Sequence, residues 1–206
     1  MKSGSLIMFE GLDGSCKSTQ VKRLVAALRE CDFDVVETRE PTDGEYGRRI
    51  RAMASSGEKV SPETELEWFF ADRREHVQRL IEPALAKGQI VVSDRYFLST
   101  VAYQGARGLD SRKILEMSEA EFPLPDLVLL LEIDGAAGLD RVTARGAKRE
   151  EVFEEASFLS QVAQEFARIE RPYLARINAA RAPDAVFEDV RRVVREVRAR
   201  VREDRR

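Results

Sequence analysis

The sequence predicts a three-layer α/β/α protein built on a five-stranded parallel sheet. Five short apolar runs are each bounded by turn residues or charges, a pattern typical of strands buried on both faces of a parallel sheet. Segments with a helical period separate these runs, and strands that alternate with helices indicate right-handed βαβ units. The expected strands are 6–9, 34–38, 90–93, 127–133 and 185–187.

Helices are expected between these strands. In 21–28 the apolar residues recur at i, i+3, i+4 and i+7, which is the period of one helix face. A longer helix is predicted for 62–86, with Ser61 as its N-cap, Pro62 as its first residue and Lys87–Gly88 as its end. Helices are also expected over 157–177 and 190–201.

Composition limits the classes of protein that this chain can belong to. Its 206 residues fit one domain, 1–206, and carry a net charge of -3, which argues against a nucleic-acid-binding surface. The two cysteines are too few for a disulfide scaffold and indicate a reducing compartment. No apolar run reaches the ~18 residues of a membrane span, and the N-terminal run is too short for a signal peptide. We therefore expect a soluble, cytoplasmic protein with no membrane partner.

The first expected strand leads directly into a glycine-rich loop, and the first expected helix follows at once. The pattern Gly-x4-Gly-Lys-[Ser/Thr] surrounds phosphate oxygens with backbone N–H groups, while Lys17 reaches the β and γ phosphates. The Ser18 hydroxyl would be a ligand of Mg2+. The sequence thus predicts a P-loop NTPase fold that binds ATP with Mg2+. The expected ATP-binding residues are Gly11, Leu12, Asp13, Gly14, Ser15, Cys16, Lys17, Ser18 and Thr19.

Cys16 departs from this pattern, because it stands where the second glycine belongs. If the position requires a positive φ, its Cβ costs ~1–2 kcal/mol. The peptide N–H of Cys16 survives the replacement. We therefore expect a weakened phosphate site rather than an abolished one.

Later motifs resemble those of the thymidylate kinases, and they cover nearly the whole chain in the order of that family. The string Asp-Arg-Tyr-x-x-Ser-Thr-x-Ala-Tyr-Gln-Gly at 94–105 is the most specific of them. The other matching segments are 9–14, 38–41, 69–73 and 131–134. The resemblance implies a single nucleoside monophosphate kinase domain that transfers the γ-phosphoryl group of ATP to dTMP, giving dTDP, with Mg2+. It also implies a homodimer.

The resemblance assigns roles to individual residues. Asp94 and Ser18 would hold the metal, Lys17 and Arg95 would contact the phosphates, and Arg51 is either a further phosphate contact or a solvated arginine. Of the acceptor site, Arg39 would hold the dTMP phosphate, Phe69 would stack on thymine, Arg73 would reach the base edge and Tyr103 would pack beneath the deoxyribose. The expected dTMP-binding residues are Asp13, Arg39, Phe69, Arg73, Arg95, Ser99, Thr100, Tyr103 and Gln104.

A lid is expected at about 141–155. Gly14 stands where some thymidylate kinases have an arginine, and those with glycine take their catalytic cation from the lid. The candidates are Arg145, Lys148 and Arg149. Because Val152 replaces an arginine that the family often has, the identity of this cation stays open, with Arg149 favoured.

Two other functions remain open on the sequence alone. One is a kinase for another nucleoside monophosphate. The other is a nucleotide-binding regulator with weakened or lost catalysis, which the changes at Cys16 and Val152 suggest. Retention of Lys17, Asp94 and Arg95 favours an active enzyme, because catalytic decay usually removes such groups first.

Overall fold

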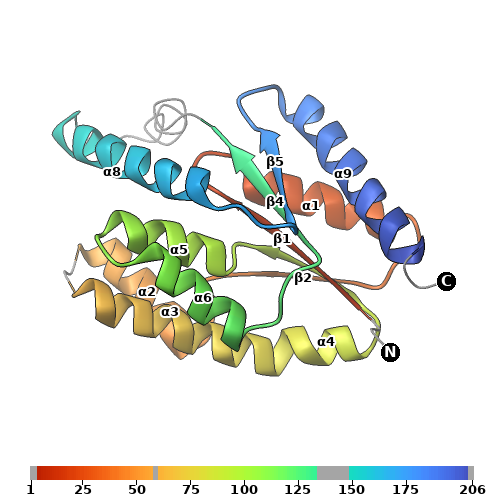
Figure 1. The fold of residues 1–206 in the computed structure, drawn as a ribbon, viewed down its shortest axis with the longest axis horizontal. Coiled ribbons are helices and arrows are strands. Elements are labelled where there is room, and N and C mark those ends of the chain that lie inside the picture. The colour runs from red at the N-terminus through yellow and green to blue at the C-terminus, as the bar shows by residue number, and fades with distance from the viewer. Residues whose placement is uncertain (1–3, 58–59, 134–148, 204–206) are drawn as a thin grey trace.

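The computed structural model describes residues 4–57, 60–133 and 149–203, with side chains described for 4–57, 60–133 and 156–197. Its centre is a sheet of five parallel strands in the order β2-β3-β1-β4-β5 (Figure 1). This arrangement confirms the fold class predicted from the sequence. The strands are β1 (Ser5–Gly11), β2 (Val35–Arg39), β3 (Ile90–Asp94), β4 (Leu127–Glu132) and β5 (Leu174–Asn178).

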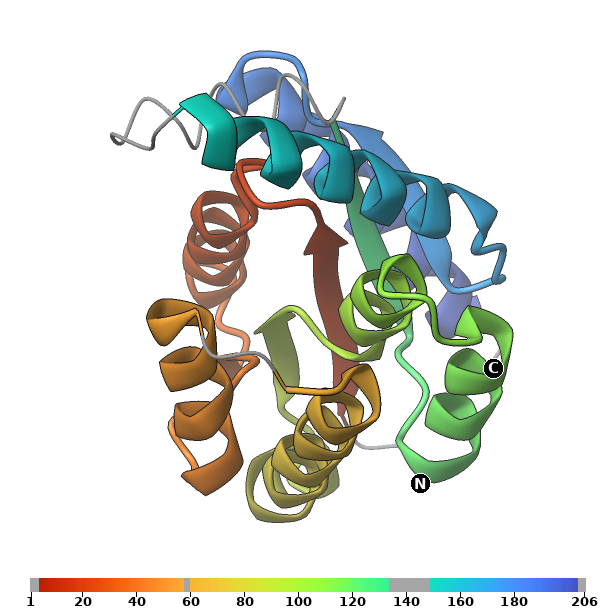
Figure 2. The same cartoon turned by 90° about the vertical axis from the view of Figure 1, so that its left-hand side faces the viewer.

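Helices cover both faces of the sheet, and β1 lies between α1 on one side and α5 on the other (Figure 2). The helices α1 and α9 pack on one face, whereas α3, α5, α6 and α8 pack on the opposite face. The helical segments are α1 (Lys17–Arg29), α2 (Glu45–Ser56), α3 (Pro62–His76), η1 (Val77–Ile81), α4 (Glu82–Ala86), α5 (Phe97–Ala106), α6 (Ser111–Glu121), α8 (Arg149–Arg168) and α9 (Pro183–Glu203).

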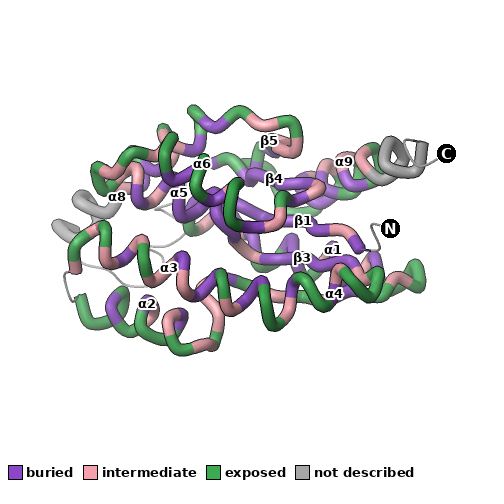
Figure 3. Tube along the Cα trace, turned by 60° about the horizontal axis from the view of Figure 1, so that its bottom comes forward, coloured by how far each residue is buried: buried purple, intermediate pink, exposed green. Residues whose placement is uncertain are grey.

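Both faces of the sheet are covered by helices, so consecutive residues of a strand are all buried and the strands are continuous apolar runs. In β1, Leu6 and Met8 enter the core under α5 and α6, while Ile7 and Phe9 enter the core under α1 and α9. All four side chains are buried. Figure 3 shows the same pattern over the molecule, with buried residues along the strands and exposed residues on the outer faces of the helices.

The predicted fifth strand was wrong. Residues 185–187 lie in the first turns of α9, where Val186 and Phe187 face the core together with Val190. The true fifth strand is β5, which the sequence analysis placed at the end of a helix over 157–177. That helix, α8, ends at Arg168, and Pro172 follows it as a residue that cannot continue a helix.

The long helix predicted over 62–86 is confirmed, as α3, η1 and α4 follow one another without a break. Ser61 is its N-cap, and its side chain accepts a hydrogen bond from the backbone N–H of Thr64. Val77–Ile81 form a π-helical turn within it. Among the described helices, none is both long and apolar enough to cross a membrane.

Candidate active site

The glycine-rich loop connects β1 to α1, as expected. Gly11 has a φ of 137°, and a Cβ at this position would lie 2.4 Å from the carbonyl oxygen of Leu131. The ammonium of Lys17, the first residue of α1, is folded back over the loop, where Nζ donates to the carbonyls of Gly11 at 3.0 Å and Leu12 at 2.8 Å. The N-terminus of α1 and a buried lysine thus face the same point, an arrangement that favours an anion.

Cys16 is the N-cap of α1 and has left-handed backbone angles, with φ 63° and ψ 26°. The position therefore requires a positive φ, which glycine adopts without strain. The cost that the sequence analysis gave for a Cβ at a positive φ thus applies to Cys16. The side chain stays half-buried in the loop, with its Sγ 3.7 Å from the carbonyl oxygen of Gly14.

Replacing Cys16 by glycine is expected to raise the free energy of unfolding by about 1 kcal/mol. Relief of ~1–2 kcal/mol of left-handed strain is partly offset by the freedom that glycine adds to the unfolded chain, ~0.5–1 kcal/mol. Urea denaturation measures the difference. Asp32→Gly is the matched control, because Asp32 also has a positive φ, 60°, but is exposed and remote from the loop. A loss of stability in Cys16→Gly alone would show that the thiol contacts outweigh the strain.

Two oxygen groups adjoin the phosphate loop. The Ser18 hydroxyl, on α1, donates a hydrogen bond to Oδ2 of Asp94 at the end of β3. Mg2+ prefers oxygen ligands and is usually held by one or two carboxylates together with substrate phosphates and water. The described residues contain no cluster of three acidic, histidine or cysteine side chains that could hold a metal alone. The pair of Ser18 and Asp94 therefore fits a magnesium ion that arrives with phosphates.

Arg95 connects the phosphate loop with the rest of the site. Its Nη1 donates to the carbonyl of Gly11 at 3.1 Å and to the Ser99 hydroxyl at 2.7 Å, and its Nη2 donates to Asp13 at 2.6 Å. Burial raises the pKa of Asp13, but the charges of Arg95 and Lys17 outweigh it and hold that pKa below its usual value. Asp13 is therefore ionised beside Arg95 and Lys17.

A cavity of about 700 Å³ opens beside Arg95. Phe69 is half-buried and lines it, whereas its neighbour Phe70 is buried in the core against Phe122. Phe69, expected to stack on thymine, thus faces the cavity, whereas Phe70 belongs to the core. Six of the nine residues expected to bind dTMP lie in the wall of this cavity: Asp13, Phe69, Arg95, Ser99, Thr100 and Tyr103.

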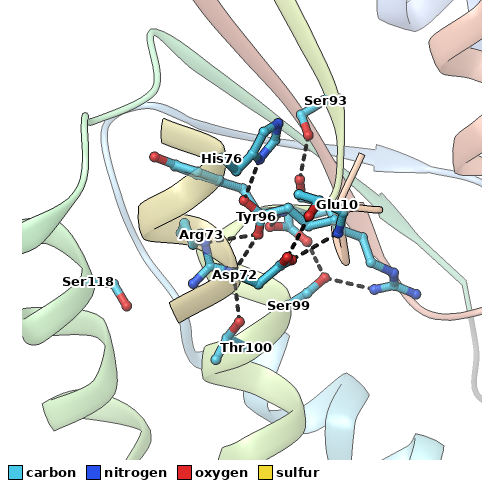
Figure 4. Close-up of polar contacts among 12 residues, drawn as sticks. Glu10, Asp72, Arg73, His76, Ser93, Tyr96, Ser99, Thr100 and Ser118 are labelled. Atoms are coloured by element: carbon cyan, nitrogen blue, oxygen red, sulfur yellow. Dashed lines mark hydrogen bonds and ion pairs between the residues drawn. The ribbon is translucent and has the colours of Figure 1, made fainter. Parts of the chain in front are cut away.

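Arg73 and Gln104, also expected at this site, are buried behind the cavity residues. Arg73 is 1% exposed, and its guanidinium donates to Glu40 at 2.7 and 2.9 Å. It also donates to the Thr100 hydroxyl at 2.9 Å (Figure 4). Within the described part of the chain, Nη1 of Arg73 and both amide atoms of Gln104 are buried without a hydrogen-bond partner. Buried polar atoms of this kind cost free energy unless a ligand or water satisfies them.

Glu40 is the buried anion that accompanies Arg73. It also accepts a hydrogen bond from Nδ1 of His76 at 2.9 Å, and Nε2 of His76 lies 2.7 Å from the Thr38 hydroxyl. Burial raises the pKa of Glu40, but Arg73 and His76 outweigh burial and keep the pKa below its usual value. The ion pair fixes Arg73 beside the cavity.

Arg39 lies in a second cavity, of about 640 Å³, which Ser18 and Asp94 also line. Its Nη2 is 3.2 Å from Oδ1 of Asp43, and Nη2 of Arg51 is 2.9 Å from the same oxygen. Two arginines thus already share one anion of the chain. The peptide bond between Glu40 and Pro41, beside them, is cis.

The expected lid falls mostly outside the described residues. Arg145 and Lys148 belong to the part that the structure leaves out, and Arg149 is the first residue of α8, without a described side chain.

Comparison with known protein families decides what this site belongs to. The family model described as "Thymidylate kinase" matches residues 9–190, which span both the phosphate loop and the cavity. The chain belongs to the thymidylate kinase family. Relatives named "Thymidylate kinase" include one from Desulfotalea psychrophila, 46% identical over 91% of this chain and 92% of its own, and one from Akkermansia muciniphila, 42% identical over 94% and 92%. A third, from Xanthomonas oryzae, is 40% identical over 93% and 83%.

In this thymidylate kinase family member, sequence reasoning missed the buried carboxylates of Glu10 and Glu40. Both were quoted within motifs but were given no role. For Glu10 the signal is a charged residue next to an uninterrupted apolar run, because an ionised group in that place needs a partner. Glu40 follows the polar end of β2 and carries no such signal. Their partners come from elements far along the chain, which the sequence does not identify.

Proposed function

We propose that this chain transfers the γ-phosphoryl group of ATP to dTMP, giving dTDP, with Mg2+. The observation that carries the proposal is the position of Arg95, whose guanidinium touches the carbonyl of Gly11 in the phosphate loop and also lines the cavity. A donor bound on the loop and an acceptor in the cavity would therefore meet at one arginine. Phosphoryl transfer depends mainly on such positioning and on neutralising charge.

The acceptor base would lie in the cavity beside Phe69. Arg73 and Gln104 do not line the cavity, so the base would reach them only as the residues in front of them shift. The unsatisfied Nη1 of Arg73 would then donate to a carbonyl oxygen of the base, and the amide of Gln104 would both donate and accept. A pyrimidine with carbonyl groups, such as thymine, presents the complementary atoms. Tyr103 would lie between the base and the phosphate loop, since it lines the cavity and its hydroxyl donates to Oδ2 of Asp13 at 3.3 Å.

The phosphate of the acceptor would bind Arg39 and Arg51. Both arginines already bind the Asp43 carboxylate, so their guanidinium groups converge on one anion without help from a ligand. A dianionic phosphate offers more charge and more acceptors than this exposed carboxylate. Arg95 would contact the same phosphate from the side of the loop.

Ser18 and Asp94 would hold Mg2+, which neutralises phosphate charge when it is bound. Lys17 would donate from α1 to the transferred phosphoryl group, and Arg95 would hold the acceptor oxygen in line with it. The remaining cation is assigned to the lid, with Arg149 as the favoured residue.

A spectrophotometric assay of ATP consumption tests this function. With wild-type protein and Mg2+, dTMP should be phosphorylated at a higher kcat/KM than dUMP, CMP or AMP. A preference for another acceptor would indicate a different nucleoside monophosphate kinase. No turnover with any acceptor, together with ATP binding in calorimetry, would favour a nucleotide-binding regulator.

Arg149→Ala is expected to lower kcat about 10³-fold, the effect of removing a cation that stabilises the transferred phosphoryl group. The Kd for dTMP, measured by calorimetry, should stay within a factor of two, since the acceptor lies in the cavity. Arg168→Ala, at the other end of α8, is the control. An unchanged kcat would remove Arg149 from the mechanism and leave Arg145 and Lys148 as candidates.

We also propose a cytoplasmic homodimer. Two large apolar side chains that the structure describes as exposed, Met117 (43%) and Leu124 (52%), lie on α6 and just after it. Such a surface gains free energy when a second copy covers it. Sedimentation velocity at micromolar concentration measures the state, and a monomer would refute the proposal. Cell fractionation tests the location.

A further inference from the structure

Glu10 is a carboxylate inside the core. It is the penultimate residue of β1 and is 0% exposed. Its Oε1 accepts the backbone N–H of Tyr96 at 2.9 Å, and its Oε2 accepts the hydroxyl of Ser99 (Figure 4). Both donors lie around the start of α5, next to Arg95. Glu10 itself lines neither of the two cavities of the site.

The backbone of Arg95 is held on every side. Its φ of 74° is left-handed, a conformation that costs free energy for a residue with a side chain. Its N–H donates to the carbonyl of Phe9 at 2.8 Å, and its carbonyl accepts the Ser93 hydroxyl at 2.8 Å. The next N–H, that of Tyr96, is the one that Glu10 accepts. The hydrogen bond from the Tyr96 N–H to Glu10 is therefore the third of three bonds that hold the backbone of Arg95 in its left-handed conformation.

The side chain of Arg95 is held by the same carboxylate through one intermediate. The Ser99 hydroxyl has a single proton, and this proton points to Glu10 because a carboxylate can only accept. An oxygen lone pair of Ser99 therefore faces Nη1 of Arg95, which donates to it at 2.7 Å. Since the Arg95 guanidinium can only donate, the direction of both hydrogen bonds is fixed when Glu10 is ionised.

A buried carboxylate at position 10 lowers the stability of the folded protein, because its charge loses contact with water. Burial raises the pKa of Glu10 to about 7, although the hydrogen bond from Ser99 and the charge of Arg95 lower it. A fully buried ionisable group that reaches a cavity-lining arginine through one hydroxyl is typical of a functional site rather than of a core chosen for stability.

We propose that Glu10 is a positioning residue, which acts through Ser99 and the N–H of Tyr96 to fix the Arg95 guanidinium between the phosphate loop and the acceptor cavity. The proposal rests on the proposed function, in which Arg95 contacts substrate phosphate. It assigns no contact between Glu10 and substrate or metal.

The first test is Glu10→Gln, which keeps the shape of the side chain and removes its charge. With the amide oxygen on the Tyr96 N–H, the amide N–H can only donate to the Ser99 oxygen, so this bond is reversed, the Ser99 proton loses its acceptor, and the amide competes with Arg95 for the same oxygen. We expect kcat to fall about 10–100-fold, the loss typical when the hydrogen bonds behind a functional side chain are removed. The KM for ATP should change less than twofold. Glu119→Gln is the control, because Glu119 also serves an arginine and a hydroxyl, those of Arg171 and Tyr173, away from the site.

A double-mutant cycle separates positioning from a general structural role. In an Arg95→Met background, Glu10→Gln should cause no further loss of kcat, since its effect passes through the missing guanidinium. An equal loss in both backgrounds would overturn the proposal, as would wild-type kcat in the single variant. If the wild type does not phosphorylate dTMP, the proposed function has failed, and the cycle is measured with the nucleoside monophosphate that it does phosphorylate.

Ser99→Ala serves as a second variant in case Glu10→Gln does not fold. It leaves the bond between Glu10 and Tyr96 in place and removes the hydroxyl between Glu10 and Arg95. A loss of kcat similar to that of Glu10→Gln, with a melting temperature near that of the wild type, is the expected result. Full activity of Ser99→Ala would show that the side chain of Arg95 does not depend on this route.

Discussion

Lys17→Met is expected to lower kcat/KM for phosphoryl transfer by about 10²–10³-fold, the typical effect of removing one preorganised donor from a developing charge. The structure gives a second, more specific expectation. Burial and the nearby charge of Arg95 lower the pKa of Lys17 to about 7, although Asp13, Asp94 and Glu10 raise it. At pH 8 the empty site therefore holds mostly neutral Lys17, and phosphate groups will favour its charged form.

Binding of ATP at pH 8 should consequently take up on the order of one proton. Calorimetry in buffers of different ionisation enthalpy measures this uptake. Lys17→Met should abolish it, whereas Lys87→Met, an exposed lysine just before the start of β3, should leave it unchanged. Equal proton uptake by wild type and Lys17→Met would exclude Lys17 as the group that titrates.

The same pKa predicts how Lys17 affects stability. Between about pH 7 and its usual value of 10.5, the unfolded chain binds a proton that the folded chain has released. The free energy of unfolding therefore rises with pH in this window, relative to that of Lys17→Met. The cost of charging Lys17 is fully present below pH 7. Urea denaturation of both proteins from pH 6 to 9 gives the slope.

The phosphate loop was predictable because its information is local. A strand, a glycine pattern and a helix follow one another within about twenty residues, and the pattern itself states which backbone angles are needed. The pattern was informative even at Cys16, which breaks it. Cys16 stands in a glycine position of the pattern, and its backbone has the positive φ, 63°, that such a position requires.

The fifth strand was not predictable in the same way. β5 is the outermost strand beside β4, and only Ile177 in it is buried, so it lacks the continuous apolar run of an internal strand. An apolar run of this kind occurs instead at the start of α9, in 185–187. It arises there because a helix that packs on a sheet can bury two consecutive residues, here Val186 and Phe187. Over three residues, the two patterns are alike.

The buried charged residues show a second reason why part of the site could not be predicted from the sequence. Residue types at the strand ends indicated a charged site, but the bonds of Glu10 reach 86 and 89 residues along the chain. Arg73 was expected to face the base, yet its ion pair with Glu40 depends on how α3 packs against the end of β2. Only the packed structure tells which acid neutralises which arginine.

Arg73→Met is expected to destabilise the protein by about 3–5 kcal/mol, because it leaves the buried Glu40 without its arginine and with only His76 as an ion-pair partner. The neighbouring Arg74 is the matched control. Its ion pair with Glu121 is exposed, 57% and 34% for the two side chains, so Arg74→Met should cost about 0–1 kcal/mol. Urea denaturation at pH 7.5 measures both variants on the same helix.

The pH dependence distinguishes an unpaired charge from lost packing. In the wild type, the lowered pKa of Glu40 gives stability that is present above its usual value of 4.5 and is lost as pH falls through the folded value. In Arg73→Met, the strongest influence that opposes burial is gone, so the pKa of Glu40 rises, and lowering the pH lets the carboxyl take a proton and relieves the cost. The difference in unfolding free energy between the two proteins should therefore shrink from pH 7.5 to 4.5. A difference that stays constant over this range would mean that Arg73 stabilises the protein through packing against Tyr96 and Phe122 and not through Glu40.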